Sequence, residues 1–487
     1  GIAIGEVMPD TWKDDSLLTS QTSVPLRLAH GIGAAAFGIK NNGFDYFLLL
    51  FYGTIVGLEP GLVGLAILIA LLFDAISDPL VGYWSDNLRS KWGRRHPFMY
   101  ASAFPVAFSY FLLWNPPDWS QSGLFWYLTL TAIMIRTFIT FYETPSTSLL
   151  PELTKDYDER TSVQSYRQFF GWAGGNLMSV LMFGVILAGS GGMQQRDGYE
   201  TYGIVASVLI FAAIMISTLG THHRIPSLSQ PNPAGEKYSL KRVITEMVET
   251  WTEKSFLALF LSMIFGSVAT GLAASLSFIL LNYFWGFSEF QLFIWTATVF
   301  FSAFFGFIIA PRASRRFGKK NATIYLGIIA FTMAPAPVIL RLFDLMPDNG
   351  HPMLFPIVVT INIIDLSLII AIQAVLASMV ADLVESNEAK TGRRNEGVYY
   401  ASITFTRKAT QGLGALAAGL ILTFIAFPQG AAPELVEEET LWWLGALYAP
   451  SVLLLWAVML YCVSLYKIDR STHMSNLQKV FNTKAKF

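Results

Sequence analysis

Two carboxylates, Asp74 and Asp78, stand four residues apart in a segment that is otherwise apolar. On a helix this spacing places both side chains on one face, and ionisable groups inside a membrane are costly and commonly functional. Two carboxylates in a medium of low dielectric constant cannot both stay ionised unless a positive charge neutralises them. A Na⁺ ion held by oxygen ligands or a shared proton would supply that charge, so the pair predicts a site for a coupling cation. The alternative is a structural pair held by loop arginines such as Arg94.

Lys408 lies deep in a later apolar run and could supply a competing positive charge. In that case the empty site is neutralised internally, and entry of a cation releases the lysine. The alternative is a lysine whose stem lies along the apolar region while its amine reaches the interface, as we expect of the neighbouring Arg407.

Glu143 and Arg167 fall in two consecutive apolar runs. A carboxylate and a guanidinium can form bidentate hydrogen bonds with vicinal hydroxyls or with an anionic head group, which predicts a solute site. A buried ion pair between two helices explains the same residues without any substrate. Arg136, seven residues before Glu143, is another candidate partner for that carboxylate.

Acidic residues also end one of the later apolar runs, next to basic ones. Asp382 and Glu385 are followed closely by three Lys or Arg residues. They are either a solvated helix end or a cytoplasmic gate that closes against Arg94 and Arg95.

The elements that must position these side chains are membrane helices. The chain has 487 residues, of which 53% are hydrophobic and only 14% charged, whereas a soluble domain carries about 25% charged residues. Apolar runs of about 20 residues span a hydrocarbon core and must be helical there. Twelve such runs are expected, at 24–52, 60–84, 97–115, 122–148, 163–188, 200–220, 255–285, 288–311, 321–343, 352–382, 397–427 and 439–466.

The basic residues predict the orientation. Six of the connecting or terminal segments hold 24 of the 33 Lys and Arg residues, whereas the loops on the other face hold Arg196 alone. Cytoplasmic loops are the positive ones, so both termini are expected in the cytoplasm, with a bacterial inner membrane as the location. The expected organisation is a cytoplasmic segment 1–23, a six-helix bundle 24–220, a cytoplasmic linker 221–254, a second bundle 255–466 and a cytoplasmic tail 467–487.

A weak internal repeat supports two similar halves. Residues 92–95 read Trp-Gly-Arg-Arg and residues 317–320 read Phe-Gly-Lys-Lys, at the same place in each half. Duplicated halves are common among transporters, with the solute site near the middle of the membrane between them.

Other function classes find little support in the sequence. The net charge of −1 indicates no nucleic-acid partner, and the single cysteine, Cys462, cannot form an internal disulfide. Neither an H-E-x-x-H metal motif nor a G-x-S-x-G nucleophile motif is present, so we expect no enzyme. No cofactor is expected beyond the coupling ion, Na⁺ or H⁺.

Three separated motifs resemble the glycoside–pentoside–hexuronide:cation symporters of the major facilitator superfamily, the family that includes melibiose permease. They lie at 73–82 with 92–97, at 149–154 with 158–161 and 165–167, and at 381–382 with 391–397 and 408. The resemblance implies an all-α fold of twelve membrane helices in two pseudo-symmetric six-helix bundles. It also implies roles for individual residues: cation binding for Asp74, Ser77, Asp78 and Thr140, coupling for Lys408, and solute binding for Glu143 and Arg167.

Two departures from the family pattern bear on the substrate. The tryptophan that stacks on sugar in melibiose permease falls at Thr147, and the sugar-binding aspartate of the first helix falls near Lys40 or Asn41. Tyr142 and Trp172 are the candidate replacement platforms. Ser77, where melibiose permease has asparagine, keeps an oxygen ligand for Na⁺ at Asp74 and Asp78.

We therefore expect a secondary transporter that couples a cation to a sugar or glycoside by alternating access, surrounded by membrane lipids. A cation-coupled carrier of a lysolipid or another amphiphile is the alternative within transport. A receptor or scaffold that transports nothing is the alternative outside it.

Overall fold

The computed structural model describes residues 22–154, 157–228, 254–391 and 396–467, together with 241, 244–245, 248–249, 252, 475, 478–479 and 482. Each of the twelve expected segments coincides with a helix, or with a run of consecutive helices, within these residues. No strand occurs in the part of the chain that the structure describes. The all-helical fold class is therefore confirmed, whereas the boundaries of the linker and the tails fall largely outside the described residues and stay predictions.

The first half begins with a segment of short pieces and continues with longer helices. Its elements are α2 (Val24–Ile32), α3 (Ala34–Asn42), η3 (Gly43–Phe47), α4 (Leu48–Leu50), η4 (Phe51–Val56), α5 (Pro60–Asn87), α6 (His96–Leu113), α7 (Gln121–Leu153), α8 (Tyr157–Leu181), η5 (Met182–Ile186), α9 (Arg196–Thr221) and η6 (His222–Ser227). The π-helical turn η3 is notable because wide turns of this kind are frequent at functional sites, and it carries Asp45.

The second half repeats the pattern with longer helices. Its elements are α11 (Lys254–Ile279), η7 (Leu280–Phe284), α12 (Glu289–Phe317), α13 (Lys319–Met333), α14 (Ala336–Leu342), α15 (Leu354–Thr391), α16 (Glu396–Phe424), η8 (Pro433–Leu435) and α17 (Glu438–Ser464). Across the described residues of both halves, nine helical segments are long and apolar enough to cross a membrane.

Local sequence signals explain where several helices begin and end. Ser288 opens α12 with a capping box, in which its side chain and that of Gln291 each accept a hydrogen bond from the other residue's backbone. Gly93 and Gly318 both have left-handed backbone angles, with φ of 79° and 81°, and only glycine adopts such angles at little cost. These are the two glycines of the internal repeat, so the repeat has a glycine with a positive φ angle at the same place in each half.

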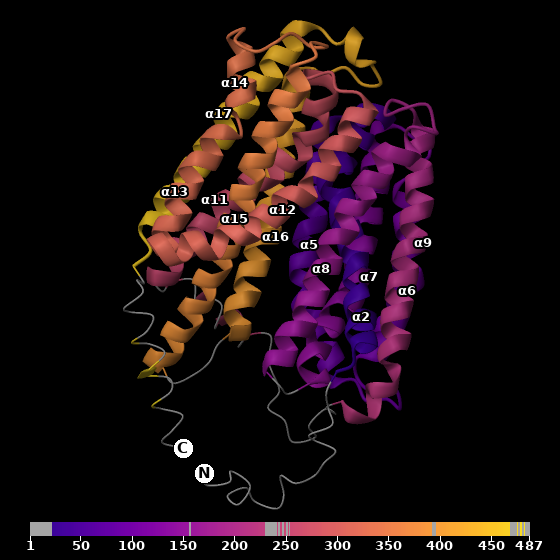
Figure 1. Cartoon of the computed structure of the whole chain (residues 1–487). Helices are drawn as coiled ribbons and strands as arrows, with labels where there is room; N and C mark the ends of the chain where they lie inside the picture. The colour runs from indigo at the N-terminus through magenta and orange to yellow at the C-terminus, as the bar shows by residue number, and fades with distance from the viewer. Residues whose placement is uncertain are drawn as a thin grey trace, which may run out of the picture.

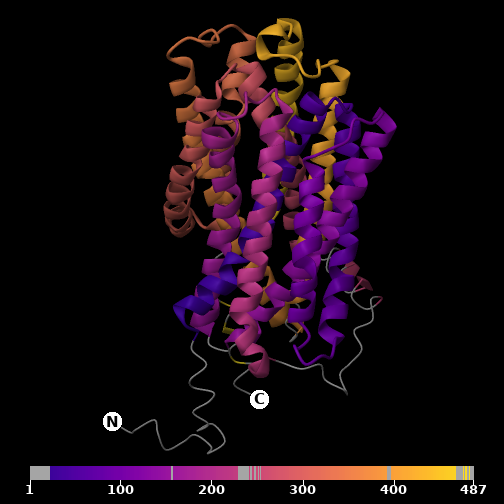
Figure 2. The ribbon, with the colours of Figure 1, turned by 90° about the vertical axis from the view of Figure 1, so that its right-hand side faces the viewer.

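The two halves form two bundles whose long helices run along a common axis (Figure 1, Figure 2). In Figure 1 the indigo-to-magenta helices of the first half lie beside the orange-to-yellow helices of the second, and the ribbons converge at one end and diverge at the other. Exposed aromatic and aliphatic side chains such as Phe104, Phe301 and Leu454 cover the outside, as expected where lipid replaces water as the solvent.

Hydrogen bonds join the halves at the convergent end. Gly61 N donates to Thr423 Oγ1 at 2.9 Å, Gly430 N to Thr54 O at 2.5 Å and Met193 N to Glu289 Oε1 at 3.2 Å. These contacts lie at the ends of the helices that face away from the basic loops. The bundles are therefore sealed against each other on the side that the sequence predicts to be non-cytoplasmic.

One glycine allows two helices of the first bundle to touch. A Cβ atom added at Gly38 of α3 would lie 2.0 Å from the carbonyl oxygen of Gly171 in α8. We expect Gly38→Ala to lower the melting temperature of the purified protein, because overpacking of a tight contact commonly costs about 1–3 kcal/mol.

Gly171→Ala is the matched control from the same contact. Its added Cβ atom would meet its nearest neighbour, Phe37 Cε2, at 3.4 Å, which is ordinary packing. Equal melting temperatures for the two variants would show that the α3–α8 contact does not require glycine at position 38.

Candidate functional site

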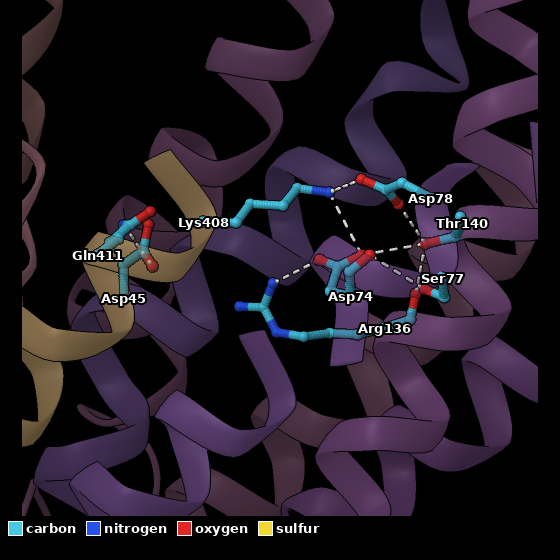
Figure 3. Close-up of polar contacts among 8 residues, drawn as sticks. All are labelled: Asp45, Asp74, Ser77, Asp78, Arg136, Thr140, Lys408 and Gln411. Atoms are coloured by element: carbon cyan, nitrogen blue, oxygen red, sulfur yellow. Dashed lines mark hydrogen bonds and ion pairs between the residues drawn. The ribbon is translucent and has the colours of Figure 1, made fainter. Parts of the chain in front are cut away.

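Asp74 and Asp78 share one face of α5, as their spacing predicts, and both meet the same hydroxyl group (Figure 3). Oγ1 of Thr140 on α7 lies 3.1 Å from Oδ1 of Asp74 and 3.1 Å from Oδ1 of Asp78. Asp74 is almost fully buried, with 1% of its surface exposed. The two carboxylates and the hydroxyl thus place oxygen atoms around one point, which suits a hard cation such as Na⁺.

Lys408 reaches this pair from the other half of the protein. Its Nζ atom lies 2.5 Å from Asp78 Oδ2 and 3.3 Å from Asp74 Oδ1. The lysine is itself buried on α16, so it does not reach the membrane interface as the snorkelling alternative requires. The contact joins α16 of the second bundle to α5 of the first (Figure 3).

Arg136 on α7 also contacts these acids, although the sequence suggested Glu143 as its partner. Its Nη1 atom donates to Asp74 Oδ2 at 3.0 Å, so the proposed pairing of Arg136 with Glu143 is not what the structure has. The physical reason is distance along the helix, because Arg136 and Glu143 stand two turns, about 10 Å, apart, whereas Asp74 of α5 lies directly opposite Arg136 and Thr140. We call Asp74, Asp78, Arg136, Thr140 and Lys408 the charge cluster.

Ser77 lies beside the charge cluster on α5. Its hydroxyl donates to the backbone oxygen of Asp74 at 3.1 Å, and Figure 3 shows it near Thr140 of α7. Among the described residues no group of three His, Cys, Asp or Glu side chains could hold a metal ion. A cation here would therefore depend on the two carboxylates with hydroxyl oxygens, and this cation-binding role of the residues stays a prediction.

A cavity of about 690 Å³ lies between the two bundles. The solute-binding candidates Glu143, Thr147, Arg167 and Trp172 all line it. Its wall also includes many amide side chains and further aromatic rings, which are Asn41, Asn42, Gln164, Gln168, Asn176, Asn362, Gln373, Phe37, Tyr46, Phe278 and Trp295. A wall of amides, charges and aromatic rings in a cavity of this size suits a small polar solute.

Glu143 and Arg167 do not form the buried ion pair that was the alternative to a solute site. Arg167 donates instead to Ser146 Oγ at 2.7 Å and to Thr147 Oγ1 at 2.9 Å, and its guanidinium lies over the ring of Phe37. The side chain of Glu143 makes no hydrogen bond or ion pair with any described residue. Both groups therefore keep capacity to bind a solute.

Two predicted solute contacts are displaced from the cavity. Tyr142 is fully buried and donates to Ser217 Oγ at 2.7 Å, so its ring packs inside the first bundle. Lys40 is 2% exposed and is not part of the cavity wall. Trp172 does line the cavity, where its ring packs edge-on against Phe300 of the second bundle. Trp172 is therefore the available replacement platform.

Asp45 lines the cavity but was not among the predicted site residues. It lies in the wide turn η3 and accepts a hydrogen bond from Gln411 Nε2 of α16 at 3.2 Å, across the two halves. The available signal was its position as an acid inside an apolar run, but no partner at helical spacing pointed to its use. Helix α16 thus supplies both Lys408 and the hydrogen-bond partner of Asp45.

The candidate cytoplasmic gate is divided between the halves. Arg94 forms an ion pair with Glu152 of α7, and Arg95 donates to Ser85 Oγ at 2.6 Å. Asp382 is held by Lys319 at 2.7 Å in the second half. The side chain of Glu385 lies outside the described residues. A closed gate between these groups stays a prediction.

Several relatives of this chain are named as symporters. A putative glycoside/cation symporter of Escherichia coli is 25% identical over 92% of this chain and 93% of its own. The sodium-dependent lysophosphatidylcholine symporter 1 of Gallus gallus is 24% identical over 93% of this chain and 88% of its own. An uncharacterised symporter of Synechocystis is 35% identical, over 42% of this chain and 38% of its own.

Solved transporter structures share the architecture. A bacterial homologue of the lysosomal transporter Spinster superposes with a TM-score of 0.61 over 95% of this chain and 99% of its own, at 14% identity, which supports the fold alone. The family model described as MFS/sugar transport protein matches residues 29–470. This confirms the resemblance found in the motifs, and the protein is a multi-pass membrane transporter rather than an enzyme. The chain belongs to the MFS/sugar transport protein family.

Proposed function

We propose that this transporter moves a sugar or glycoside together with one monovalent cation by alternating access. The observation that carries the proposal is the charge cluster next to the cavity. Lys408 of the second half neutralises the two acids of the first half, so a cation that takes its place would release a contact between the bundles. Coupling then follows because the cation and the solute act on the same bundle-to-bundle arrangement.

The cavity supports a polyhydroxylated solute. Glu143 and Arg167 offer a free acceptor and charged donors, and the surrounding amides can bond to hydroxyl groups of either polarity. Trp172 and Trp295 supply flat faces on which the apolar face of a sugar ring can stack. The name of the relative from Escherichia coli also gives a glycoside as the solute.

A lysolipid is the second candidate solute. The relative from Gallus gallus carries such a molecule according to its name, and the aromatic residues Phe37, Phe278 and Trp295 could contact an acyl chain. The two candidates differ in what must be accommodated, since a lysolipid needs space for a long chain beyond its head group.

Uptake into liposomes tests the proposal. We expect accumulation of a labelled glycoside in vesicles containing the purified protein when a Na⁺ gradient is applied, and none when sodium and solute are equal on both sides. A proton gradient is the parallel arm, since H⁺ is the other candidate ion. Accumulation of labelled lysophosphatidylcholine instead would select the second candidate, and the absence of any ion-driven accumulation would contradict the proposal.

We further propose a bacterial inner membrane as the location, with both termini in the cytoplasm. The distribution of Lys and Arg supports this orientation. The sealed end of the bundles then faces the outside, and the cytoplasmic end is the one at which Arg94 and Asp382 lie.

A further inference from the structure

Arg136 is locked into the charge cluster by its surroundings. Its side chain is buried at 3% exposure, and its guanidinium donates to Asp74 Oδ2 at 3.0 Å while lying 4.6 Å from the centre of the Phe44 ring. Nε of the same group has no partner among the described residues. The ion pair with Asp74 and the aromatic contact therefore fix where this positive charge lies.

The two cations of the charge cluster differ in the half from which they come. Arg136 belongs to α7 and its acid Asp74 to α5, both in the first bundle. Lys408 belongs to α16 in the second bundle. When the bundles move against each other, Lys408 can separate from the acids, but Arg136 moves together with them.

This difference fixes the charge that an entering ion meets. With Lys408 in place, two ionised acids face two cations and the cluster is neutral. With Lys408 withdrawn, two acids face Arg136 alone and the cluster carries one negative charge. Without Arg136 it would carry two.

Three other charges lie near the charge cluster, and none of them forms an ion pair with its members among the described residues. Lys40 from α3 and Glu143 from α7 have no hydrogen bond or ion pair through their side chains in this part of the chain. Asp45 from η3 accepts a hydrogen bond from Gln411 at 3.2 Å and faces Arg136 and Lys40. Lys40 also acts on Asp74, and Glu143 on Asp78 and Lys408, at longer range. The charges in direct contact with the two acids are those of Arg136 and Lys408.

We propose that Arg136 is the residue that restricts this site to a single monovalent cation and excludes divalent cations. A monovalent ion brings the open cluster to neutrality, whereas a divalent ion leaves an uncompensated positive charge in a buried region of low dielectric constant, which is costly. The inference rests on the proposed function, because it concerns the ion with which solute movement is coupled.

Cation binding to the purified full-length protein tests the inference without requiring transport. The melting temperature is followed against Na⁺ and, separately, Ca²⁺, with choline chloride keeping the ionic strength constant. Ca²⁺ is the divalent probe because it also binds oxygen ligands in flexible geometry. For the unmodified protein we expect stabilisation by a monovalent ion only, with a Na⁺ dependence that Ca²⁺ does not change.

Arg136→Gln is expected to gain a response to Ca²⁺, with a half-saturating concentration at least about tenfold lower than that of the unmodified protein. Arg136→Lys keeps the charge and should continue to exclude Ca²⁺. Adding Asp74→Asn to Arg136→Gln returns the net charge of the open cluster to −1. This double variant should therefore lose the response to Ca²⁺. That double variant separates a charge effect from a change in shape.

The inference is overturned if Arg136→Gln remains unresponsive to Ca²⁺, or if Arg136→Lys gains the same response as Arg136→Gln. Should Arg136→Gln fail to fold, displacement of Na⁺ by Ca²⁺ in the unmodified protein would overturn it equally. Ion-driven uptake in liposomes reports on the proposed function separately. Normal uptake with an unresponsive Arg136→Gln variant therefore rejects the inference alone, whereas absent uptake rejects the proposed function and leaves the Ca²⁺ comparison readable.

Discussion

Asp78→Asn is expected to abolish cation-driven accumulation of the solute, by about 100-fold or more, while exchange of solute across the membrane continues. Asp78 is the closest partner of Lys408, at 2.5 Å. Without its charge, Asp74 faces both Arg136 and Lys408, and the cluster carries a net positive charge that repels an entering cation. The measurement is uptake into liposomes, with a Na⁺ gradient for accumulation and with equal ions on both sides for exchange.

The same variant also tests whether the charge cluster holds the two bundles together. Removing one partner of a buried ion pair commonly costs about 3–5 kcal/mol, so the melting temperature of Asp78→Asn should fall. Combining it with Lys408→Gln removes the unpaired lysine and should restore much of the stability, but not the cation-driven accumulation. Recovery of accumulation in the double variant would contradict the role of Asp78 in cation binding.

Asp118→Asn provides the matched control. Asp118 is also a carboxylate in an ion pair, with Arg196 at 3.0 Å, but its side chain is 95% exposed. Exposed pairs of this kind contribute about 0–1 kcal/mol, so accumulation and stability should both stay near those of the unmodified protein. A parallel loss in Asp118→Asn and Asp78→Asn would point to a general charge effect instead of the cluster.

Local spacing explains why part of the charge cluster was predictable. The shared face of Asp74 and Asp78 follows from helix periodicity alone, and so does the position of Thr140 one turn after Arg136. The approach of Lys408 does not, because it depends on α16 of one bundle lying against α5 of the other. For Lys408 the sequence offered the hypothesis of a charge that neutralises the two acids, and the family resemblance implied the same coupling role.

Helix geometry explains the residues that were wrongly or incompletely assigned. Arg136 and Glu143 were considered as possible partners because they share a face of α7, but they stand two turns, about 10 Å, apart along the axis, and Arg136 pairs with Asp74 of α5 instead. Tyr142 neighbours Glu143 in sequence, yet adjacent residues point to different sides of a helix, and its ring turns to Ser217. Periodicity assigns residues to faces, whereas only the packing of neighbours decides which face meets the cavity.

The same reasoning applies to Asp45. Nothing at helical spacing marked this acid, because its geometry comes from the wide turn η3 and its partner Gln411 lies in the other half. A site assembled between two bundles needs the arrangement of both, and the sequence predicts that arrangement only through the repeat.

Arg167→Lys is expected to weaken solute binding about 10- to 100-fold while cation binding stays intact. The guanidinium of Arg167 donates to Ser146 and Thr147 on α7 and lies over the ring of Phe37. A lysine keeps the positive charge but lacks the planar fork of donors that can hold these hydroxyls and a solute together. Losing one hydrogen bond to a charged group commonly costs about 1.5–3 kcal/mol, which corresponds to the expected loss of affinity.

The two ligands can be measured separately on the same protein. Solute binding is followed by the shift in melting temperature with glycoside concentration, and cation binding by the shift with Na⁺ alone. Arg196→Lys is the control, because Arg196 begins α9, does not line the cavity and pairs with an exposed acid. Arg167 touches none of the five residues of the charge cluster, so the solute and the cation are expected to bind to different residues. A loss of the Na⁺ response in Arg167→Lys would contradict this separation. An unchanged response to the solute would contradict solute binding by Arg167.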